Sequence, residues 1–228
     1  MAKVQKIKEA LEKMPKLTKL AWDKVFEKEG KFFIKPEKCV RKVTKFFKKE
    51  GIKRVLDLGC GSGRHLVFLA KRGFDVYGID IAREGIKIAK EWLKEERLKA
   101  NLKIGDFYKR LPYKDDFFDA IISIAALHHG KIEEIRKLIK EMKRILKPEG
   151  LIFVTLHKKL PKKKIPKDRL FGIKYIAPRT YIILGGPEKG GVHYNFNEKI
   201  LKKEFKDFEF LKLWLEPGHY CLLGKLKK

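Results

Sequence analysis

The sequence predicts an α/β fold built on a doubly wound, mostly parallel sheet. Short apolar segments with strand character alternate with longer segments in which apolar residues recur at helical spacing. The segment 55–58 is such a strand, and the glycines after it allow a sharp turn before a helix that begins near Arg64. Between Lys131 and Lys147, isoleucine, methionine and leucine side chains mark one face of an amphipathic helix. This alternation is typical of a parallel sheet with helices on both faces.

The glycine-rich turn is the most specific motif of the chain. It contains Gly59, Gly61 and Gly63, and Asp57 stands two residues before the first of them. A dinucleotide-binding loop would have its third glycine at position 64, which is Arg64 in this chain. The G-x-G-x-G spacing with an acidic residue upstream instead resembles motif I of the class I S-adenosylmethionine-dependent methyltransferases.

Later segments match the same family in the same order. The segment 74–80 alternates and ends in Asp80, roughly 20 positions after the glycine loop, where a carboxylate is placed to bind two ribose hydroxyls. The segments 102–107, 118–124 and 146–155 correspond to the third, fourth and fifth strands with their turns. The resemblance implies an enzyme with a seven-stranded, mostly parallel sheet, an antiparallel last strand and S-adenosylmethionine as its cofactor.

The resemblance also implies roles for individual side chains. In this family the glycine loop passes beneath the methionine part of the cofactor, and an acidic residue at the place of Asp57 helps to hold its ammonium group. Asp106 and Phe107 match the acidic and apolar residues that the family places at the adenine ring. The expected cofactor-binding residues are Trp22, Asp57, Gly59, Gly61, Gly63, Asp80, Ile81, Asp106 and Phe107.

The chain is expected to form an N-terminal lid and one catalytic core. Residues 1–50 contain helical patterns for the lid and the first helix, and residues 51–228 form the core. Trp22 and Phe33 are candidate lid contacts with the cofactor, although anchoring of the helices to the core explains them equally well. An insertion is expected at about 158–194.

The end of the chain is predicted to complete the sheet. A last helix is expected to start near Asn195 or Asn197, with Asn195 and Glu198 spaced as a capping box, and to run to about Phe205. The apolar segments 208–215 and 219–226 flank Pro217-Gly218 and predict a strand hairpin.

Composition excludes several classes of protein. A hydrophobic fraction of 44% excludes wholesale disorder, and no stretch approaches the roughly 20 apolar residues of a membrane span. The first residues lack the apolar core of a signal peptide, so a cytoplasmic location and no membrane partner are expected.

Cys39, Cys60 and Cys221 form neither a zinc pattern nor a disulfide framework, which predicts reduced, mostly buried thiols and no metal. The Lys- and Glu-rich composition resembles that of a thermophile, and a monomer is expected.

The net charge of +27 indicates an anionic partner. Residues 1–50 contain 16 basic and 7 acidic side chains, and residues 158–170 contain 7 basic side chains and one acidic. This second segment, here called the basic loop, follows the fifth strand and so leaves the sheet on the ligand side. Such a loop suits a phosphate backbone, although a solvated charge run is the alternative. The expected RNA-binding residues are Lys158, Lys159, Lys162, Lys163, Lys164, Lys167 and Arg169.

The sequence offers few candidates for catalytic residues. The loop after the fourth strand contains His128 and His129, either of which is able to take a proton near neutral pH or to orient the acceptor. Capping of the following helix or burial in the core explains them equally well. Tyr194, with His193 beside it, is a weaker candidate.

Absent motifs narrow the chemistry of the acceptor. Methyltransferases that act on exocyclic amines of bases often have D/N/S-P-P-Y/F after the fourth strand, and this chain keeps only Ser123 of that pattern. Methylation of pyrimidine C5 needs a cysteine near the substrate, and no cysteine of the chain is placed there. The leading hypothesis is a methyltransferase for a nucleotide of ribosomal or transfer RNA. The alternatives are a small-molecule methyltransferase and, from a different class, a binding module without activity.

Overall fold

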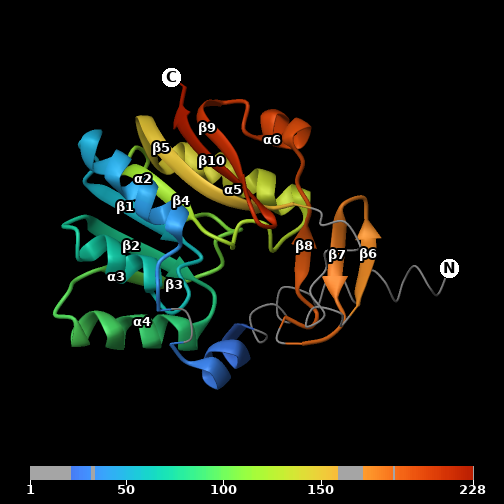
Figure 1. Ribbon diagram of the computed structural model, residues 1–228, viewed down its shortest axis with the longest axis horizontal. Helices are drawn as coiled ribbons and strands as arrows, with labels where there is room; N and C mark the ends of the chain where they lie inside the picture. The colour runs from blue at the N-terminus through green and yellow to red at the C-terminus, as the bar shows by residue number, and fades with distance from the viewer. Residues whose placement is uncertain (1–21, 32–33, 159–171, 187, 228) are drawn as a thin grey trace.

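The computed structural model describes residues 22–31, 34–158, 172–186 and 188–227. Its main sheet has seven strands in the order β3-β2-β1-β4-β5-β10-β9 (Figure 1). The strands β1, β2, β3, β4 and β5 are parallel, and β10 pairs antiparallel with both β5 and β9. The predicted seven-stranded, mostly parallel sheet with an antiparallel last strand is therefore confirmed. The strands of the main sheet are β1 (Arg54–Leu58), β2 (Asp75–Asp80), β3 (Asn101–Ile104), β4 (Phe118–Ser123), β5 (Leu146–His157), β9 (Phe208–Glu216) and β10 (His219–Leu226).

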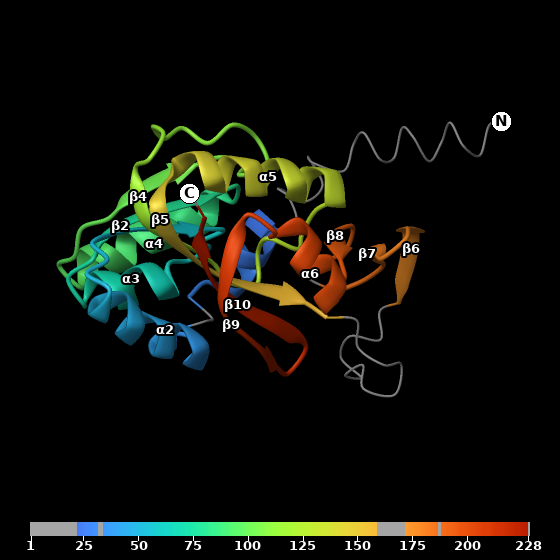
Figure 2. The same cartoon turned by 90° about the horizontal axis from the view of Figure 1, so that it is seen from above.

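Helices cover both faces of this sheet, as Figure 2 shows from above. One hydrophobic core contains side chains of α5 and α6, and a second core contains side chains of α2, α3 and α4. Successive residues of each central strand contribute to opposite cores, because side chains alternate across a sheet. In β1, Leu56 belongs to the first core and Val55 to the second. The helices are α2 (Lys38–Lys49), α3 (Arg64–Ala70), α4 (Arg83–Glu95), α5 (Ile132–Ile145) and α6 (Glu198–Glu204).

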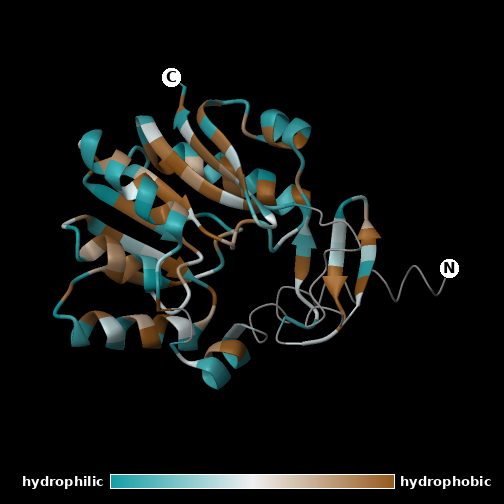
Figure 3. Cartoon of the chain, viewed as in Figure 1, coloured by the Kyte–Doolittle hydropathy of each residue, from teal (hydrophilic) through white to brown (hydrophobic). Residues whose placement is uncertain are grey.

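A second, three-stranded sheet lies beside the main one. Its strands β6 (Ile173–Ala177), β7 (Thr180–Ile183) and β8 (Val192–Tyr194) pair antiparallel in chain order. Figure 1 shows this small sheet beyond the carboxyl end of strand β5. Its strands fall within the segment 158–194, in which we expect an insertion. Coloured by hydropathy, the strands of the main sheet are mostly brown and their covering helices show teal outer faces (Figure 3).

Two details differ from the sequence predictions. The last helix is capped by Asn197, whose side chain accepts a hydrogen bond from the Ile200 amide at 2.9 Å, and not by a box formed from Asn195 and Glu198. Asn195 is buried and comes two residues too early to reach the first turn. The fifth strand is also longer than expected, since β5 begins at Leu146 directly after α5.

Some predicted features lie outside the described residues. These are residues 1–21 of the expected lid, the lid candidate Phe33 and the basic loop after Lys158. No helix among the described residues has the length and apolar character to cross a membrane. The expected cytoplasmic location and monomeric state stay predictions.

Arg144 of α5 fixes the segment that connects β3 to β4. Its guanidinium donates to the carbonyl oxygens of Leu111 and Tyr113 at 3.0 and 2.9 Å, and it also binds the carboxylates of Asp115 and Glu141. Arg136 on the same helix makes two 2.8 Å hydrogen bonds to Glu204, but its own side chain is half exposed. The two arginines therefore differ in how much of the backbone they hold.

We predict that Arg144→Lys destabilises the protein by about 2 kcal/mol, because one ammonium group cannot replace four directed contacts. The matched variant Arg136→Lys is expected to cost less than about 1 kcal/mol, as for an exposed ion pair. Urea unfolding of both variants measures the difference. Equal losses would show that the Arg144 contacts contribute no more than a surface pair.

Candidate active site

The site lies at the carboxyl ends of β1 and β4, the two central strands of the main sheet. These strands pair in parallel through Val55–Ala120, Leu56–Ile121 and Asp57–Ile122. Strand order continues outward from β1 to β2 and β3 on one side, and from β4 to β5 on the other. At such a reversal the connections leave in opposite directions and open a crevice above the strand ends, which is where open α/β sheets bind ligands.

Glycines shape the floor of this crevice. Gly59 has φ +77°, and a Cβ atom added to it would lie 2.3 Å from the Cβ of Ala126. Gly61 has φ +50°, and a Cβ there would lie 2.9 Å from the ring of Phe26. Because both positions combine a left-handed backbone with close neighbours, only glycine fits them without displacement.

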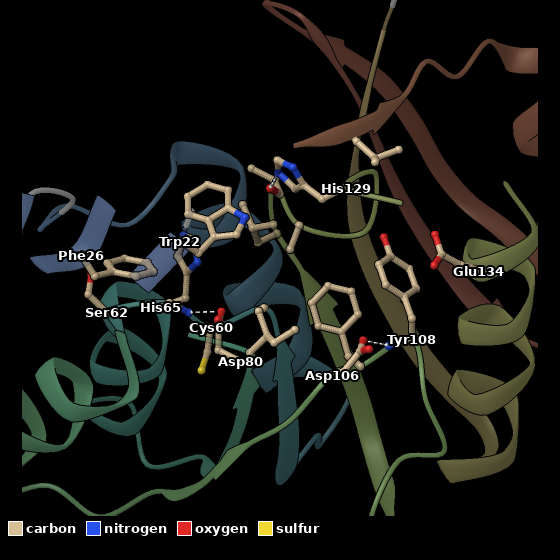
Figure 4. A pocket seen from close by; sticks show the side chains of 18 of the residues that line it. Trp22, Phe26, Cys60, Ser62, His65, Asp80, Asp106, Tyr108, His129 and Glu134 are labelled. Carbon is tan, nitrogen blue, oxygen red and sulfur yellow. Dashed lines mark hydrogen bonds between the residues drawn. The ribbon is translucent and has the colours of Figure 1, made fainter. Parts of the chain in front are cut away.

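A pocket opens above the loop (Figure 4). In this view Trp22 and His129 face each other across its upper side, while Asp80 and Asp106 lie lower and further in. Most of the lining comes from the helical residues 22–29, the glycine loop with the start of α3, the turns after β2 and β3, and the loop between β4 and α5 with the first turn of α5, and β8 adds one residue. The lining residues are Trp22, Phe26, Gly59, Cys60, Gly61, Ser62, Arg64, His65, Asp80, Ile81, Asp106, Phe107, Tyr108, Ile124, Ala125, Ala126, His129, Lys131, Glu134 and Val192.

The carboxylate of Asp80 ties the glycine loop to the end of β2. One oxygen accepts from the Gly61 amide and the other from the Ala82 amide, both at 2.8 Å. Burial raises the pKa of Asp80, and the backbone hydrogen bonds from Ala82 and Gly61 oppose that rise. The remaining lone pairs of this carboxylate are able to accept hydroxyl hydrogens from a ligand.

Asp57 is buried beneath the loop without a partner. Neither of its carboxylate oxygens has a hydrogen bond within the described part of the chain. Burial, reinforced by the charge of Asp80, raises the pKa of Asp57 to about 8, although Arg64 acts in the opposite direction. A buried carboxylate of this kind costs free energy unless a cation or hydrogen-bond donor approaches it. Asp57 is therefore prepared for a positively charged ligand group.

The turn after β3 forms the inner wall. Asp106 accepts a hydrogen bond from the Tyr108 amide at 2.9 Å, which closes a tight turn. The Tyr108 hydroxyl donates to the carbonyl of Leu127 at 2.8 Å and so joins this turn to the loop after β4. Phe107, between them, is buried and presents an aromatic ring to the pocket.

The loop after β4 is held in a strained conformation. Ala125 has φ +55°, a region that residues other than glycine rarely adopt, and its amide donates to the Thr155 hydroxyl at 2.8 Å. The carbonyl of Ala125 lies 2.9 Å from Nε2 of His129. Trp22 approaches His129 at 90°, with 5.3 Å between ring centroids. These contacts fix the position of His129 at the pocket.

Burial keeps both loop histidines neutral. It lowers the pKa of His129 to about 3 and lowers the pKa of His128 well below its usual value, and the neighbouring histidines add to both effects. The sequence hypothesis gave them either proton transfer near neutral pH or orientation of the acceptor. In the folded chain they instead offer neutral imidazole rings of fixed orientation.

This arrangement has counterparts among solved structures. A S-adenosylmethionine-dependent methyltransferase from Methanosarcina mazei superposes with a TM-score of 0.66 and 25% sequence identity, over 77% of this chain and 93% of that one. Residues 55–150 also match the sequence model of a family described as a methyltransferase domain. The chain contains a class I S-adenosylmethionine-dependent methyltransferase domain. The resemblance inferred from the glycine motif is thus confirmed.

Curated relatives of this methyltransferase domain have diverse substrates. A tRNA (carboxymethyluridine(34)-5-O)-methyltransferase from Arabidopsis thaliana is 38% identical over 103 residues, which are 45% of this chain and 23% of that protein. A ubiquinone biosynthesis O-methyltransferase from Rickettsia felis is 27% identical over 155 residues, 65% of this chain and 60% of that protein. The chain spans less than two thirds of the length of either relative.

The residues of the methyltransferase domain fit S-adenosylmethionine. The unpartnered carboxylate of Asp57 suits its ammonium group, and the Cβ-free surface of Gly59 and Gly61 leaves room for a ligand to approach the backbone. Asp80 and Phe107 would take the ribose and the adenine ring. The cofactor, as predicted, is S-adenosylmethionine.

Most of the predicted cofactor residues meet at one pocket. Trp22, Gly59, Gly61, Asp80, Ile81, Asp106 and Phe107 line it, whereas Asp57 and Gly63 lie outside the lining. Of the catalytic candidates, only His129 lines the pocket. His128 is buried behind it, and Tyr194 packs edge-on against Phe196 in the core.

Sequence reasoning missed several lining residues. Phe26 and Tyr108 carried a usable signal, because Phe26 is one helical turn from Trp22 and Tyr108 follows the predicted adenine contact. Val192 carried none, since the pairing of β7 with β8 brings it to the pocket from a distant segment.

We predict that Gly59→Ala weakens binding of S-adenosylmethionine at least 10-fold, because the new methyl group must displace Ala126 and distort the floor. Gly73→Ala is the matched control: its φ is +78° and no atom lies within 4 Å of the added Cβ. The control is expected to lose about 1 kcal/mol of stability and to keep its affinity for the cofactor. Calorimetric titration measures both affinities, and equal affinities would refute the steric explanation.

Asp57 makes the stability of the protein depend on pH. Because its folded pKa of about 8 lies above the ordinary value of 3.8, the folded state holds the proton more tightly than the unfolded state. The cofactor-free protein therefore loses stability as pH rises from 4 to 8. Asp57→Asn removes this loss, so the difference in melting temperature between variant and wild type should grow with pH, while affinity for S-adenosylmethionine falls. A difference independent of pH would contradict the assignment.

Proposed function

We propose that this chain transfers the methyl group of S-adenosylmethionine to an oxygen atom of a nucleotide in structured RNA. The observation that carries the proposal is a net charge of +27 on a chain with a methyltransferase pocket. An excess of this size favours binding to a polyanion, because each neutralised phosphate releases counterions. The Arabidopsis relative, named as a tRNA methyltransferase, supports the same class of substrate.

Oxygen is the acceptor that agrees best with the site. The loop after β4 lacks the motif for exocyclic amines, since Ile124 and Ala125 stand where prolines would be expected. Attack by a cysteine is disfavoured because burial raises the pKa of Cys60 well above its usual value. The Arabidopsis relative is named for methylation of an oxygen.

The bound cofactor would supply a methyl group on a positively charged sulfur, open to in-line displacement. Catalysis of such a transfer depends on alignment of the acceptor and on exclusion of water. Trp22 and Phe107 provide apolar walls, and the Ala125 carbonyl with the Trp22 ring holds His129 at the rim. A neutral, oriented imidazole is suited to position an acceptor oxygen through one hydrogen bond.

Basic residues begin close to this pocket. Lys131 lines it, and β5 ends where the basic loop begins. The amide of Lys158 donates to the Gly218 carbonyl at 2.8 Å, which anchors the start of the loop to the hairpin of β9 and β10. We therefore assign phosphate binding to the basic loop.

A small-molecule acceptor is the second candidate. The ubiquinone biosynthesis O-methyltransferase from Rickettsia felis matches a larger share of this chain than the tRNA enzyme does, and the pocket has aromatic walls. This candidate requires no contribution from the basic loop.

The variant Lys162→Glu, Lys163→Glu, Lys164→Glu separates the two functions. We expect tRNA affinity at 50 mM salt to fall at least 10-fold and the slope of log K against log salt to drop by about 2 to 3. The matched control changes the exposed Lys45, Lys48 and Lys49 of α2 to glutamate, on a helix that shares its core with α3 and α4. Equal effects of the two triple variants would favour the small-molecule function.

Mass spectrometry of nucleosides tests the activity itself. RNA from a deletion strain should lack one O-methylated nucleoside, and purified protein with S-adenosylmethionine should restore it. An unchanged nucleoside profile would overturn the proposed function.

A further inference from the structure

Five of the six histidines of the chain form one cluster beside the methyl-transfer pocket. The ring centroid of His128 lies 4.4 Å from that of His129 and 4.9 Å from that of His157. The ring centroids of His129 and His193 are also 4.4 Å apart. His219 lies 5.2 Å from His157. The members come from four separate segments: the loop after β4, the end of β5, strand β8 and the start of β10.

Three of these histidines have the arrangement of metal ligands. One ring nitrogen from each of His128, His129 and His193 lies within 4.8 Å of those of the other two. His128 and His193 are each only 3% exposed. The Nδ1 atoms of both have no hydrogen-bond partner among the described residues. Buried polar atoms without partners are uncommon and point to an ion or ligand.

The opposite edges of two rings lie close to oxygen atoms. Nε2 of His129 is hydrogen-bonded to the Ala125 carbonyl at 2.9 Å, whereas Nε2 of His193 lies 2.9 Å from a carboxylate oxygen of Glu188 without a directed hydrogen bond. A ring that donates from Nε2 carries its lone pair on Nδ1. Metal-bound histidines typically have this arrangement, with the second nitrogen held by a carbonyl or carboxylate.

We propose that Nδ1 atoms of His128, His129 and His193 bind one divalent transition-metal ion of the zinc class. Three imidazoles and one position left for a small ligand match the donor sets of catalytic zinc sites. Tetrahedral ligands at the Zn–N length of about 2.1 Å lie about 3.4 Å apart. The ring nitrogens lie within 4.8 Å of one another, so ring rotations must bring the most widely separated nitrogens closer by up to about 1.4 Å.

The site would serve the acceptor and not the methyl donor. His129 and Val192, which precedes His193, both line the pocket, and Figure 4 shows His129 above Cys60 and Ser62 of the glycine loop. An ion held there would bind the acceptor oxygen in place of a direct hydrogen bond from His129 and orient it toward the methyl group. This role, though not the binding of the ion, rests on the proposed function. The site departs from the expectation of no metal.

Metal binding is testable without RNA. Protein treated with EDTA and then dialysed is titrated with Co²⁺, followed by visible absorption, and with Zn²⁺, followed by calorimetry. We expect one ion per chain, an intense tetrahedral Co²⁺ spectrum, and affinity at least 100-fold lower in His128→Ala and in His193→Gln. Glu188→Gln should weaken binding about 10- to 100-fold, because Glu188 positions the His193 ring.

His219→Ala is the matched control, since it removes a histidine of the cluster that is not a proposed ligand. It should change affinity less than about 3-fold. Circular dichroism and S-adenosylmethionine binding verify that each variant is folded. Absence of stoichiometric binding in the wild type, or unchanged affinity in the folded His193→Gln variant, would overturn the site. Metal binding without RNA methylation would overturn the proposed function alone.

Discussion

The bridge that Asp80 forms between two backbone amides is the interaction on which the site depends. It joins the glycine loop after β1 to the turn after β2, so two connections that leave neighbouring strands move as one unit. The Gly59 amide reinforces the joint by donating to the carbonyl of Ile79 at 2.9 Å. Phe26 can pack on this floor only because Gly61 has no side chain. The contact of Phe26 with Gly61, the glycine floor and the expected ribose site at Asp80 therefore all depend on the same carboxylate.

The electrostatics of the two halves of the pocket differ. On the donor side, Asp57 and Asp80 are buried carboxylates whose pKa values burial raises, and they await positive charge. On the acceptor side, burial lowers the pKa of His128 and His129, which leaves neutral lone pairs. Desolvation acts on both sets in the direction that removes charge. The ammonium group of the cofactor would favour the ionised form of Asp57, and a hydroxyl hydrogen of the acceptor would meet a neutral imidazole lone pair.

The residues on the donor side of the pocket could be predicted from sequence, whereas the assembly of the histidine cluster on the acceptor side could not. Asp57, Gly59 and Gly61 lie within one short run, because a strand followed by a tight turn encodes its geometry locally. Asp80 follows at a distance fixed by one intervening helix. The histidine cluster, in contrast, is created by pairing of β10 with β5 and by the position of β8, and these long-range contacts leave no regular spacing. The sequence left the start of the last helix open between Asn195 and Asn197 for a local reason, because either asparagine side chain is able to cap a helix.

The strand order has a consequence for synthesis of the protein. The strand β10 comes last in chain order among the described elements, yet it lies inside the sheet, between β5 and β9. During translation the strands β1 to β5 emerge first and are able to pair and bury their core. The edge of β5 stays open until β10 arrives and covers it. The glycine loop and the loop with His128 and His129 therefore precede β8 and β10, which supply His193 and His219 and complete the histidine cluster.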